Sequence, residues 1–369
     1  MNINSYYEFQ VIKGPLNLIL FRLPIILYSY INRFKRKLLF DAWSVSNKHH
    51  EDEYIRVLFL GKNEIDKNYF CNLIFNKNYD EIYLGKVGIW RLFFYLWGFK
   101  KNYDLIIFNS HMKLCSLLKS RSNFVIPAWI SCEIDLCCDI GLHSISKRTL
   151  KSNFKKIERG NFRYSLTKDP VDFHFFYYNM HLPYISKRHG DSAFKMSYRE
   201  MKKSFENGEL LQIKEGQEIV AGVIIDYKVM KGIPRMTKLG VLRGDFNYVK
   251  RGAIIALYYY TIQYLKQRNH KKISLGLTRP FFSDGVLQYK LNWGAKIVCE
   301  TSNGFLLSLL SKKKCLKSFL SCNPFIFKDR NSLTLATFSD HNSKECSYLP
   351  KDENKLKLYG LDKRTSFSF

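Results

Sequence analysis

The chain has 369 residues, of which 46% are hydrophobic and 16% aromatic, so two domains can each bury a core. Without a fixed-period repeat or an excess of Gly or Pro, this composition excludes disordered, solenoid and fibrous classes. Lys and Arg outnumber Asp and Glu, 59 to 32, for a net charge of +27. Such a surface attracts phosphates, anionic lipids and nucleic acid; an AT-rich genome explains the same excess, and the sequence leaves both explanations open.

The nine cysteines are odd in number and have no repeated spacing. They predict reduced thiols in a cytoplasmic protein rather than a disulfide framework. The one cluster, formed by Cys132, Cys137, Cys138 and His143, lacks the paired C-x-x-C spacing of structural zinc sites. We therefore expect no metal site.

An apolar and basic segment opens the chain at residues 1–48. Its first dozen residues predict no cleavable signal peptide. The apolar run Pro15–Ile31 is interrupted by Arg22 and Pro24, which makes it too broken for a membrane span. We expect a buried helix of the first domain here; the alternative is an in-plane anchor that holds the protein peripherally on the inner, anionic membrane face.

Residues 49–145 alternate between short apolar strands and helical periods. Strands are predicted at Tyr54–Gly61, Glu81–Gly85, Asp104–Ser110 and in NFVIPAWIS, which ends near Cys132, with helices at Lys67–Phe75 and Ile89–Gly98. This order predicts βαβ units and a small, mainly parallel sheet. We expect a small α/β companion domain.

Residues 146–339 begin with helical patterns. A basic helix precedes a short strand at Phe162–Leu166. The next helix starts at Asp169 and is expected to stop or kink before Pro183, since proline interrupts a helix. A shorter helix follows, with Ser197 as its N-cap and Gly208 as its terminator.

The hydrophobic period then changes from near 3.6 to 2. Two strands within Glu209–Val229 and a third at Met236–Gly244 predict an antiparallel meander. A helix at about Lys250–Gln267 and a return strand at Lys272–Leu277 follow. Further strands are expected at Ala295–Glu300, Gly304–Leu310 and Asn331–Ser339, and residues 340–369 are expected to form a loose polar tail.

The stretch GVLRGDFNYVKRGAIIAL, at Gly240–Leu257, places small residues where a strand leads into a helix. Backbone amides at such a helix start are open to a ligand, and the helix dipole favours a diphosphate there. The candidate cofactor-binding residues are Leu242, Arg243, Lys250, Arg251, Gly252 and Ala253. The structural alternative is a tight turn without a ligand.

The stretch DGVLQYKLNWGAKI, at Asp284–Ile297, predicts a short capped helix. With Ser283 or Asp284 as N-cap and Gly294 as its exit, one stripe carries three apolar or aromatic residues and a lysine. They are Val286, Tyr289, Lys290 and Trp293. A lysine beside aromatic rings stabilises a developing oxyanion; the alternative is a stem that packs while its amine reaches water.

The order of these elements resembles the GNAT acyltransferase superfamily. SLGLTRPFFSDGVLQYKLNWGA is similar to a segment of the Fem-type branch, in which G-L-x-x-[FY]-K-x-x-[FW]-G recurs, and FYYNMHLPYISKRHG resembles related acetyltransferases. The resemblance covers about residues 147–311. It implies an α/β (α+β) fold, with a mixed-sheet GNAT domain preceded by a smaller α/β domain.

The resemblance also implies roles for individual residues. Lys290 polarises the acyl carbonyl and Tyr289 shapes the pocket, while acetyl-CoA or another acyl-CoA binds through its diphosphate at the helix start, Lys250 to Ala253. The chain departs from the family's Q/R-x-x-G-x-G/A phrase, because Ile254 stands where a second small residue is usual.

Acceptor contacts are expected from two further stretches. Tyr184, Arg188 and His189 in PYISKRHG line the predicted acceptor pocket, and a solvated basic helix end is the alternative. Glu133 and Asp135 in ISCEIDL lie where the two predicted domains meet, which suits a polyhydroxylated or cationic acceptor.

Together these features predict an N-acyltransferase that acylates an amine of a sugar or cell-envelope precursor by direct attack. Two alternatives stay open: an aminoacyl-tRNA-dependent Fem-type ligase, and a basic binding protein on a decayed acyltransferase fold. Binding to tRNA that weakens steeply with salt distinguishes the first. An inability to bind CoA distinguishes the second.

Overall fold

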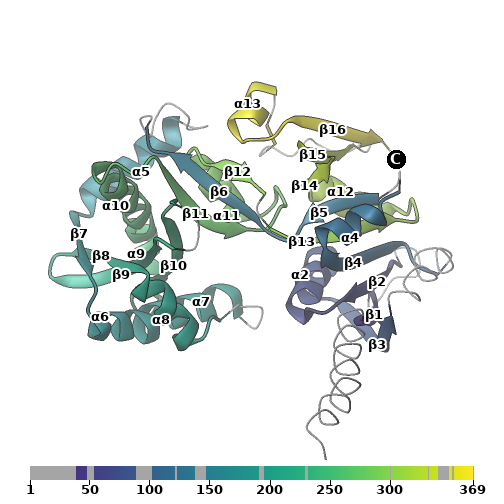
Figure 1. Ribbon diagram of the computed structural model, residues 1–369, viewed down its shortest axis with the longest axis horizontal. Helices are drawn as coiled ribbons and strands as arrows, with labels where there is room; N and C mark the ends of the chain where they lie inside the picture. The colour runs from purple at the N-terminus through teal and green to yellow at the C-terminus, as the bar shows by residue number, and fades with distance from the viewer. Residues whose placement is uncertain are drawn as a thin grey trace, which may run out of the picture.

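A computed structural model describes residues 39–47, 54–88, 102–120, 123–137, 147–190, 195–228, 232–299, 301–330, 332–339, 349–350 and 353–368. The strands in these ranges form three sheets, two large and one small (Figure 1). No helix in the same ranges combines the length and apolar character that a membrane crossing requires. The helices expected at residues 15–31 and 89–98 lie outside the described residues.

The first sheet is mainly antiparallel. Its strands in spatial order are β3 (Tyr79–Gly88), β1 (Leu39–Asn47), β2 (Arg56–Gly61), β4 (Leu105–His111), β13 (Asn303–Leu309) and β5 (Asn123–Pro127). Of its pairs, β2 and β4 alone run parallel in the described residues. The predicted mainly parallel sheet is wrong because β1 lies between β2 and β3, and β13 separates β4 from β5.

The second sheet contains the predicted meander. Its spatial order is β12 (Lys296–Val298), β6 (Ile130–Asp135), β11 (Lys272–Thr278), β10 (Arg235–Val241), β9 (Glu218–Asp226), β8 (Gly208–Glu215) and β7 (Phe162–Thr167). The antiparallel pairing of β8, β9 and β10 confirms the meander. Alternate residues of β8 face opposite cores, because Leu211 packs with α10 (Ala253–Gln267) and Leu210 with α8 (Tyr198–Glu206).

The two large sheets exchange strands, as Figure 1 shows where β6 and β13 run between them. The stretch expected to form one strand near Cys132 forms two, β5 in the first sheet and β6 in the second. The chain crosses between the sheets in the same way twice. In the first sheet, β4, α4 (Met112–Leu117) and β5 are followed by β6, which joins the second sheet. In the second sheet, β11, α11 (Gly285–Asn292) and β12 are followed by β13, which joins the first sheet. We call the first sheet with α2 (Glu64–Phe75) and α4 the first half. The second half is the second sheet with the helices packed on it, which include α8, α10 and α11.

The helical stretch after β7 continues through Pro183. It contains α6 (Pro170–Phe175), a π-helical turn η2 (Phe176–His181) and α7 (Leu182–His189). The expected interruption before Pro183 is replaced by the wider π turn, which accommodates a residue that lacks an N–H. The helix start at Asp169, which is the N-cap of α6, and the predicted N-cap Ser197 are confirmed. Ser197 also forms a capping box with Glu200.

Two glycines have roles that the pattern did not predict. Gly208 opens β8, where an added Cβ would lie 1.7 Å from the Ile225 carbonyl oxygen, so close backbone approach selects glycine. Gly252, at φ +116°, separates α9 (Phe246–Arg251) from α10, so the helix expected from about Lys250 begins at Ala253. The basic helix before β7 is α5 (Lys147–Arg159), which packs against α10 through the rings of Phe154 and Tyr259.

The C-terminal segment is folded where it is described, so the expected loose tail is wrong for residues 353–368. Helix α13 (Glu353–Leu358) leads into β16 (Lys363–Ser368), which joins β14 (Phe325–Asp329) and β15 (Ser332–Ser339), with α12 (Lys314–Cys322) before them. The Tyr359 carbonyl accepts a hydrogen bond from the Ile297 N–H at 2.7 Å. The segment therefore covers the end of the second sheet that carries β12.

We expect Leu361→Ala to lower the free energy of unfolding by about 2–5 kcal/mol, the usual cost of emptying a buried leucine site. Leu361 is 2% exposed and packs in the core of the second half. Leu358, 38% exposed in the same segment, is the matched control. Urea unfolding checks this, and equal effects of the two substitutions would contradict it.

Candidate active site

Strands β10 and β11 diverge in the middle of the second sheet. They pair at Arg235 and Ser274, whereas β10 and β9 pair along Arg235 to Val241. Between Ser274 and Leu277 the register of β11 with β6 shifts, and Gly276 takes φ +79°. This bulge interrupts the regular ladder at Gly276, beside the carbonyls of residues 276 and 277.

Lys290 uses those two carbonyls. Helix α11 begins at the N-cap Asp284, whose carboxylate accepts the N–H groups of Val286 and Leu287. One and a half turns later, Lys290 is 3% exposed, and its Nζ donates to the Gly276 oxygen at 3.0 Å and to the Leu277 oxygen at 2.8 Å. The amine therefore lies in the protein interior, not in bulk solvent as snorkelling would require.

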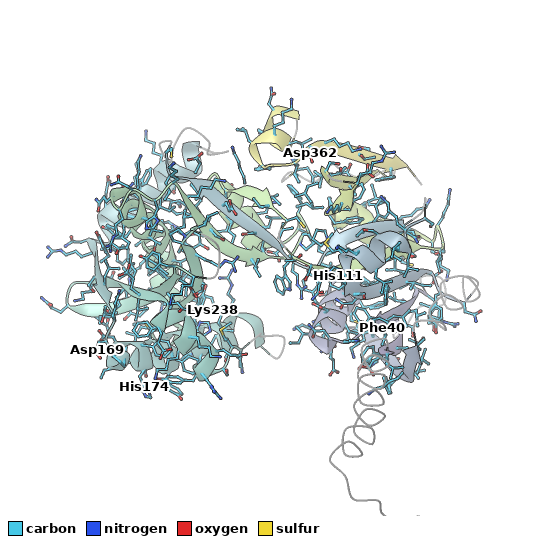
Figure 2. The ribbon with its side chains drawn as sticks, in the orientation of Figure 1. Phe40, His111, Asp169, His174, Lys238 and Asp362 are labelled. Carbon is cyan, nitrogen blue, oxygen red and sulfur yellow. The ribbon has the colours of Figure 1, made fainter. Side chains whose placement is uncertain are left out.

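The electrostatic surroundings of Lys290 weaken its charge. Burial lowers its pKa to about 8; Arg235 and Lys238 on β10 act in the same direction, while Cys132 on β6 and the N-cap Asp284 oppose it. Because this pKa lies above 7, the ammonium form of Lys290 still predominates at neutral pH. Figure 2 labels Lys238, which lies beside α7.

This shift predicts a pH-dependent stability. In the unfolded chain the lysine returns toward its ordinary pKa of 10.5, so between pH 8 and 10.5 the unfolded state binds the additional proton. Relative to Lys290→Met, the wild-type free energy of unfolding should therefore rise through this window by up to about 3 kcal/mol. Urea unfolding of both proteins at pH 7 and 10 checks this, and a constant difference between them would contradict it.

An aromatic cluster surrounds the neighbouring residues of α11. The Tyr258 ring stacks on Trp293 with centroids 5.7 Å apart, and it meets Tyr289 edge-on at 5.0 Å. Burial raises the pKa of Tyr289. Of the two residues on α7, Tyr184 also raises this pKa and Arg188 lowers it. Arg188 donates to the Tyr184 hydroxyl. The structure thus brings two predicted acceptor residues to the predicted catalytic helix; the side chain of the third, His189, lies outside the description.

The predicted phosphate site lies at the start of α10. No described side chain caps this helix, whose N-cap is Gly252. Lys250 is exposed, and an added Cβ at Gly252 would lie 3.2 Å from Cβ of Lys156 on α5. Arg251 instead binds Glu215 through two hydrogen bonds, Nε to Oε1 at 3.0 Å and Nη2 to Oε2 at 2.8 Å.

The loop between β10 and α9 is held against α7. Arg243 takes a left-handed φ of +54°, and its carbonyl accepts from Lys187 Nζ at 2.9 Å. Leu242 is buried. An added Cβ at Gly244 would lie 2.7 Å from the Pro183 backbone. The helix that supplies Tyr184 and Arg188 is therefore fixed to the strand end that leads toward α10.

Glu133 and Asp135 lie on β6, away from this cluster. Cys132 packs in the core with α11, so the next residue, Glu133, points to the opposite face of the sheet. Its carboxylate is 3.7 Å from Lys272 Nζ. Asp135 accepts the Cys137 N–H, which lowers the pKa of its carboxyl group. Their contact with an acceptor stays a prediction.

Several residues of the site have weak sequence signals. Gly276 inside a strand pattern marks a bulge, which would have indicated the interrupted ladder. Tyr258 falls within the helix predicted at about Lys250–Gln267, but nothing in that helical pattern indicates its contact with Tyr289 and Trp293. Among the described residues, no group of three His, Cys, Asp or Glu side chains is arranged to bind a metal ion.

Comparisons with known proteins give structural similarity alone. No family model and no curated protein sequence matches the chain. Solved structures that do match include L-PGS from Bacillus licheniformis, at 12% identity over 75% of this chain and 83% of that one, with a TM-score of 0.36. The C-terminal domain of a putative lysylphosphatidylglycerol synthetase from Agrobacterium fabrum matches at 11% identity over 74% and 83%, with a TM-score of 0.37.

A GCN5-related N-acetyltransferase from Sphaerobacter thermophilus also matches, at 11% identity over 56% of this chain and 60% of that one, with a TM-score of 0.31. The chain is similar to these proteins in structure. Because the identities and TM-scores are this low, no residue role is transferred from them. The candidate site therefore rests on the geometry described above.

Proposed function

We propose that the protein is an N-acyltransferase that moves an acyl group, acetyl in the simplest case, from CoA to an amine of a sugar or cell-envelope precursor. The observation that supports this most is the hydrogen bonding of Lys290. Its ammonium has three N–H bonds, and two of them are directed to the carbonyls of Gly276 and Leu277. These two bonds fix the group so that the third N–H can donate to a substrate oxygen beside the diverging strands.

The chemistry needs no covalent enzyme intermediate. The acceptor amine attacks the thioester carbonyl carbon, the carbonyl oxygen gains negative charge, and the C–S bond then breaks. The CoA thiolate leaves and takes up a proton, while the new amide nitrogen loses one. Lys290 donates a hydrogen bond to the oxygen while it is negative, which is electrostatic stabilisation by a preorganised donor. Tyr289 bounds the space for the acyl group.

The donor phosphates are assigned to the start of α10. A helix N-terminus of this length attracts a diphosphate through its first amides and its dipole. Lys250 and Lys156 add exposed positive charge at this end. Leu242, Arg243, Gly252 and Ala253 complete the proposed cofactor site, whereas Arg251 is engaged by Glu215.

Titration calorimetry with acetyl-CoA at low salt tests the donor assignment. We expect the wild type to bind, and Lys250→Ala to weaken binding about 1.4- to 5-fold, as one exposed ionic contact contributes about 0.2–1 kcal/mol. Lys271→Ala, which removes an exposed lysine beyond the other end of α10, is the matched control. No binding by the wild type would reject the acyl-CoA assignment and favour the binding-protein alternative.

Aminoacyl-tRNA is the second candidate donor, and the exposed charge of α5 favours it. Lys151, Lys155, Lys156 and Arg159 are exposed on this helix with Glu158 as the one exposed acid, a pattern that binds phosphodiesters. Turnover that requires charged tRNA, with affinity that falls steeply as salt rises, would support this donor. Turnover with acyl-CoA alone would exclude it as a requirement.

A further inference from the structure

Arg279 joins the two halves of the molecule through a buried ion pair. It follows β11 of the second half, and its Nη2 donates to the Asp66 carboxylate of α2 at 2.6 Å. Its Nη1 donates to the Ala128 carbonyl, at the point where the chain crosses between the sheets, at 3.0 Å. Both charged side chains are less than 8% exposed.

Aromatic rings and amides complete this contact. The guanidinium lies 3.8 Å from the ring centroid of Trp129 and 4.5 Å from that of Tyr69. The second Asp66 oxygen accepts from the amides of Asn63, at 3.2 Å, and Asn109, at 2.9 Å. A buried ion pair with this many partners fixes geometry more than it adds stability.

The segment that carries Arg279 leads directly into α11. Phe281 packs against Phe70 and Phe325 in the core of the first half, whereas Phe282 lies in the core of the second. The Thr278 hydroxyl lies 3.4 Å from the carboxylate of Asp284, the N-cap of α11. The first half thus holds the connection between the end of β11 and the start of α11.

Both ends of this connection meet at Lys290. The Leu277 carbonyl, two residues before Arg279, accepts a hydrogen bond from its ammonium, and α11 supplies the side chain itself. We propose that Arg279 is a positioning residue: through Asp66 it uses the first half to keep Lys290 on its two carbonyl partners. The importance of this positioning role for catalysis rests on the proposed function. The role also gives the first half a task, which is to hold Lys290 in place.

Competitive labelling of the full chain with acetic anhydride, quantified by mass spectrometry, tests the positioning without turnover. Arg279→Ala leaves a buried carboxylate unpaired and can unfold, so Asp66→Asn/Arg279→Met, which removes both charges and keeps an acceptor for the asparagines, is the main variant. We expect Lys290 to be labelled about tenfold faster at pH 7.5 in this variant, because its carbonyl partners shift and reagent enters. Lys67→Met is the matched control. Lys67 is 1% exposed and lies on α2 next to Asp66, but it pairs with Glu81.

Steady-state kinetics separate the positioning role from a purely structural one, which would not change kcat selectively. The double variant should lower kcat with little change in KM for the donor, and Arg279→Lys should recover part of kcat. Unchanged labelling of Lys290 in a folded double variant would overturn the positioning role. Because labelling does not depend on turnover, a failure of the proposed function, seen as full activity in Lys290→Ala, is distinguishable from a failure of the positioning role.

Discussion

Lys290→Ala should lower kcat for acyl transfer by about a hundredfold to a thousandfold, the usual effect of removing one oxyanion donor. The substitution removes the donor whose orientation the carbonyls of Gly276 and Leu277 fix. Steady-state release of free CoA thiol with an amine acceptor measures the effect. Lys296→Ala, an exposed lysine on β12, should retain full turnover, and circular dichroism should show both variants folded.

The pH profile of kcat distinguishes two uses of the same amine. If Lys290 acts as an ammonium donor, kcat should fall as pH rises through about 8, its shifted pKa, because the third N–H is then lost. A lysine with a pKa near 8 is also suited to act as a general base, and in that case kcat would rise through the same pH. Turnover in Lys290→Ala equal to the wild type would exclude both uses.

Arg279→Ala should lower the free energy of unfolding by about 3–5 kcal/mol, because it leaves the Asp66 carboxylate buried without its cation. Asp66 keeps two amide donors, but these do not neutralise its charge. Urea unfolding at pH 7 measures the loss. Asp66→Asn/Arg279→Met should lose less than Arg279→Ala, since replacing a whole buried pair is far less destabilising than breaking it.

A loss below 1 kcal/mol for Arg279→Ala would contradict this description of the contact. The exposed pair of Lys363 and Asp329, at 2.9 Å, gives the comparison. Lys363→Ala should change stability by no more than about 1 kcal/mol, because solvent screens exposed ion pairs.

Local features of the fold were predictable from the sequence. The meander follows from period-2 alternation between turn residues, and β8 to β10 confirm it. The capping box at Ser197 and the N-cap at Asp284 follow from side chains that satisfy the first amides of their own helices. Gly294 takes the expected left-handed conformation after α11, at φ +80°. Such features depend on residues within a few positions of one another.

Features that join distant parts of the chain were not predictable. The ion pair of Arg279 and Asp66 spans 213 positions, and no periodicity links the two residues. The apolar strands β6 and β13 have the same local pattern whichever sheet they join, so the strand exchange was missed. The folded C-terminal segment was missed for a related reason: its polar surface conceals three buried residues, Leu356, Tyr359 and Leu361, at a spacing too irregular to indicate a helix.

A crystal structure with a non-hydrolysable acyl-CoA, in which a methylene replaces the thioester sulfur, tests the central claim most directly. The account predicts the acyl carbonyl oxygen within hydrogen-bonding distance of Lys290 Nζ, about 2.7–3.2 Å, and the diphosphate at the first amides of α10. An analogue bound with its carbonyl on the face of the sheet opposite Lys290, or with its phosphates away from Gly252, would contradict it.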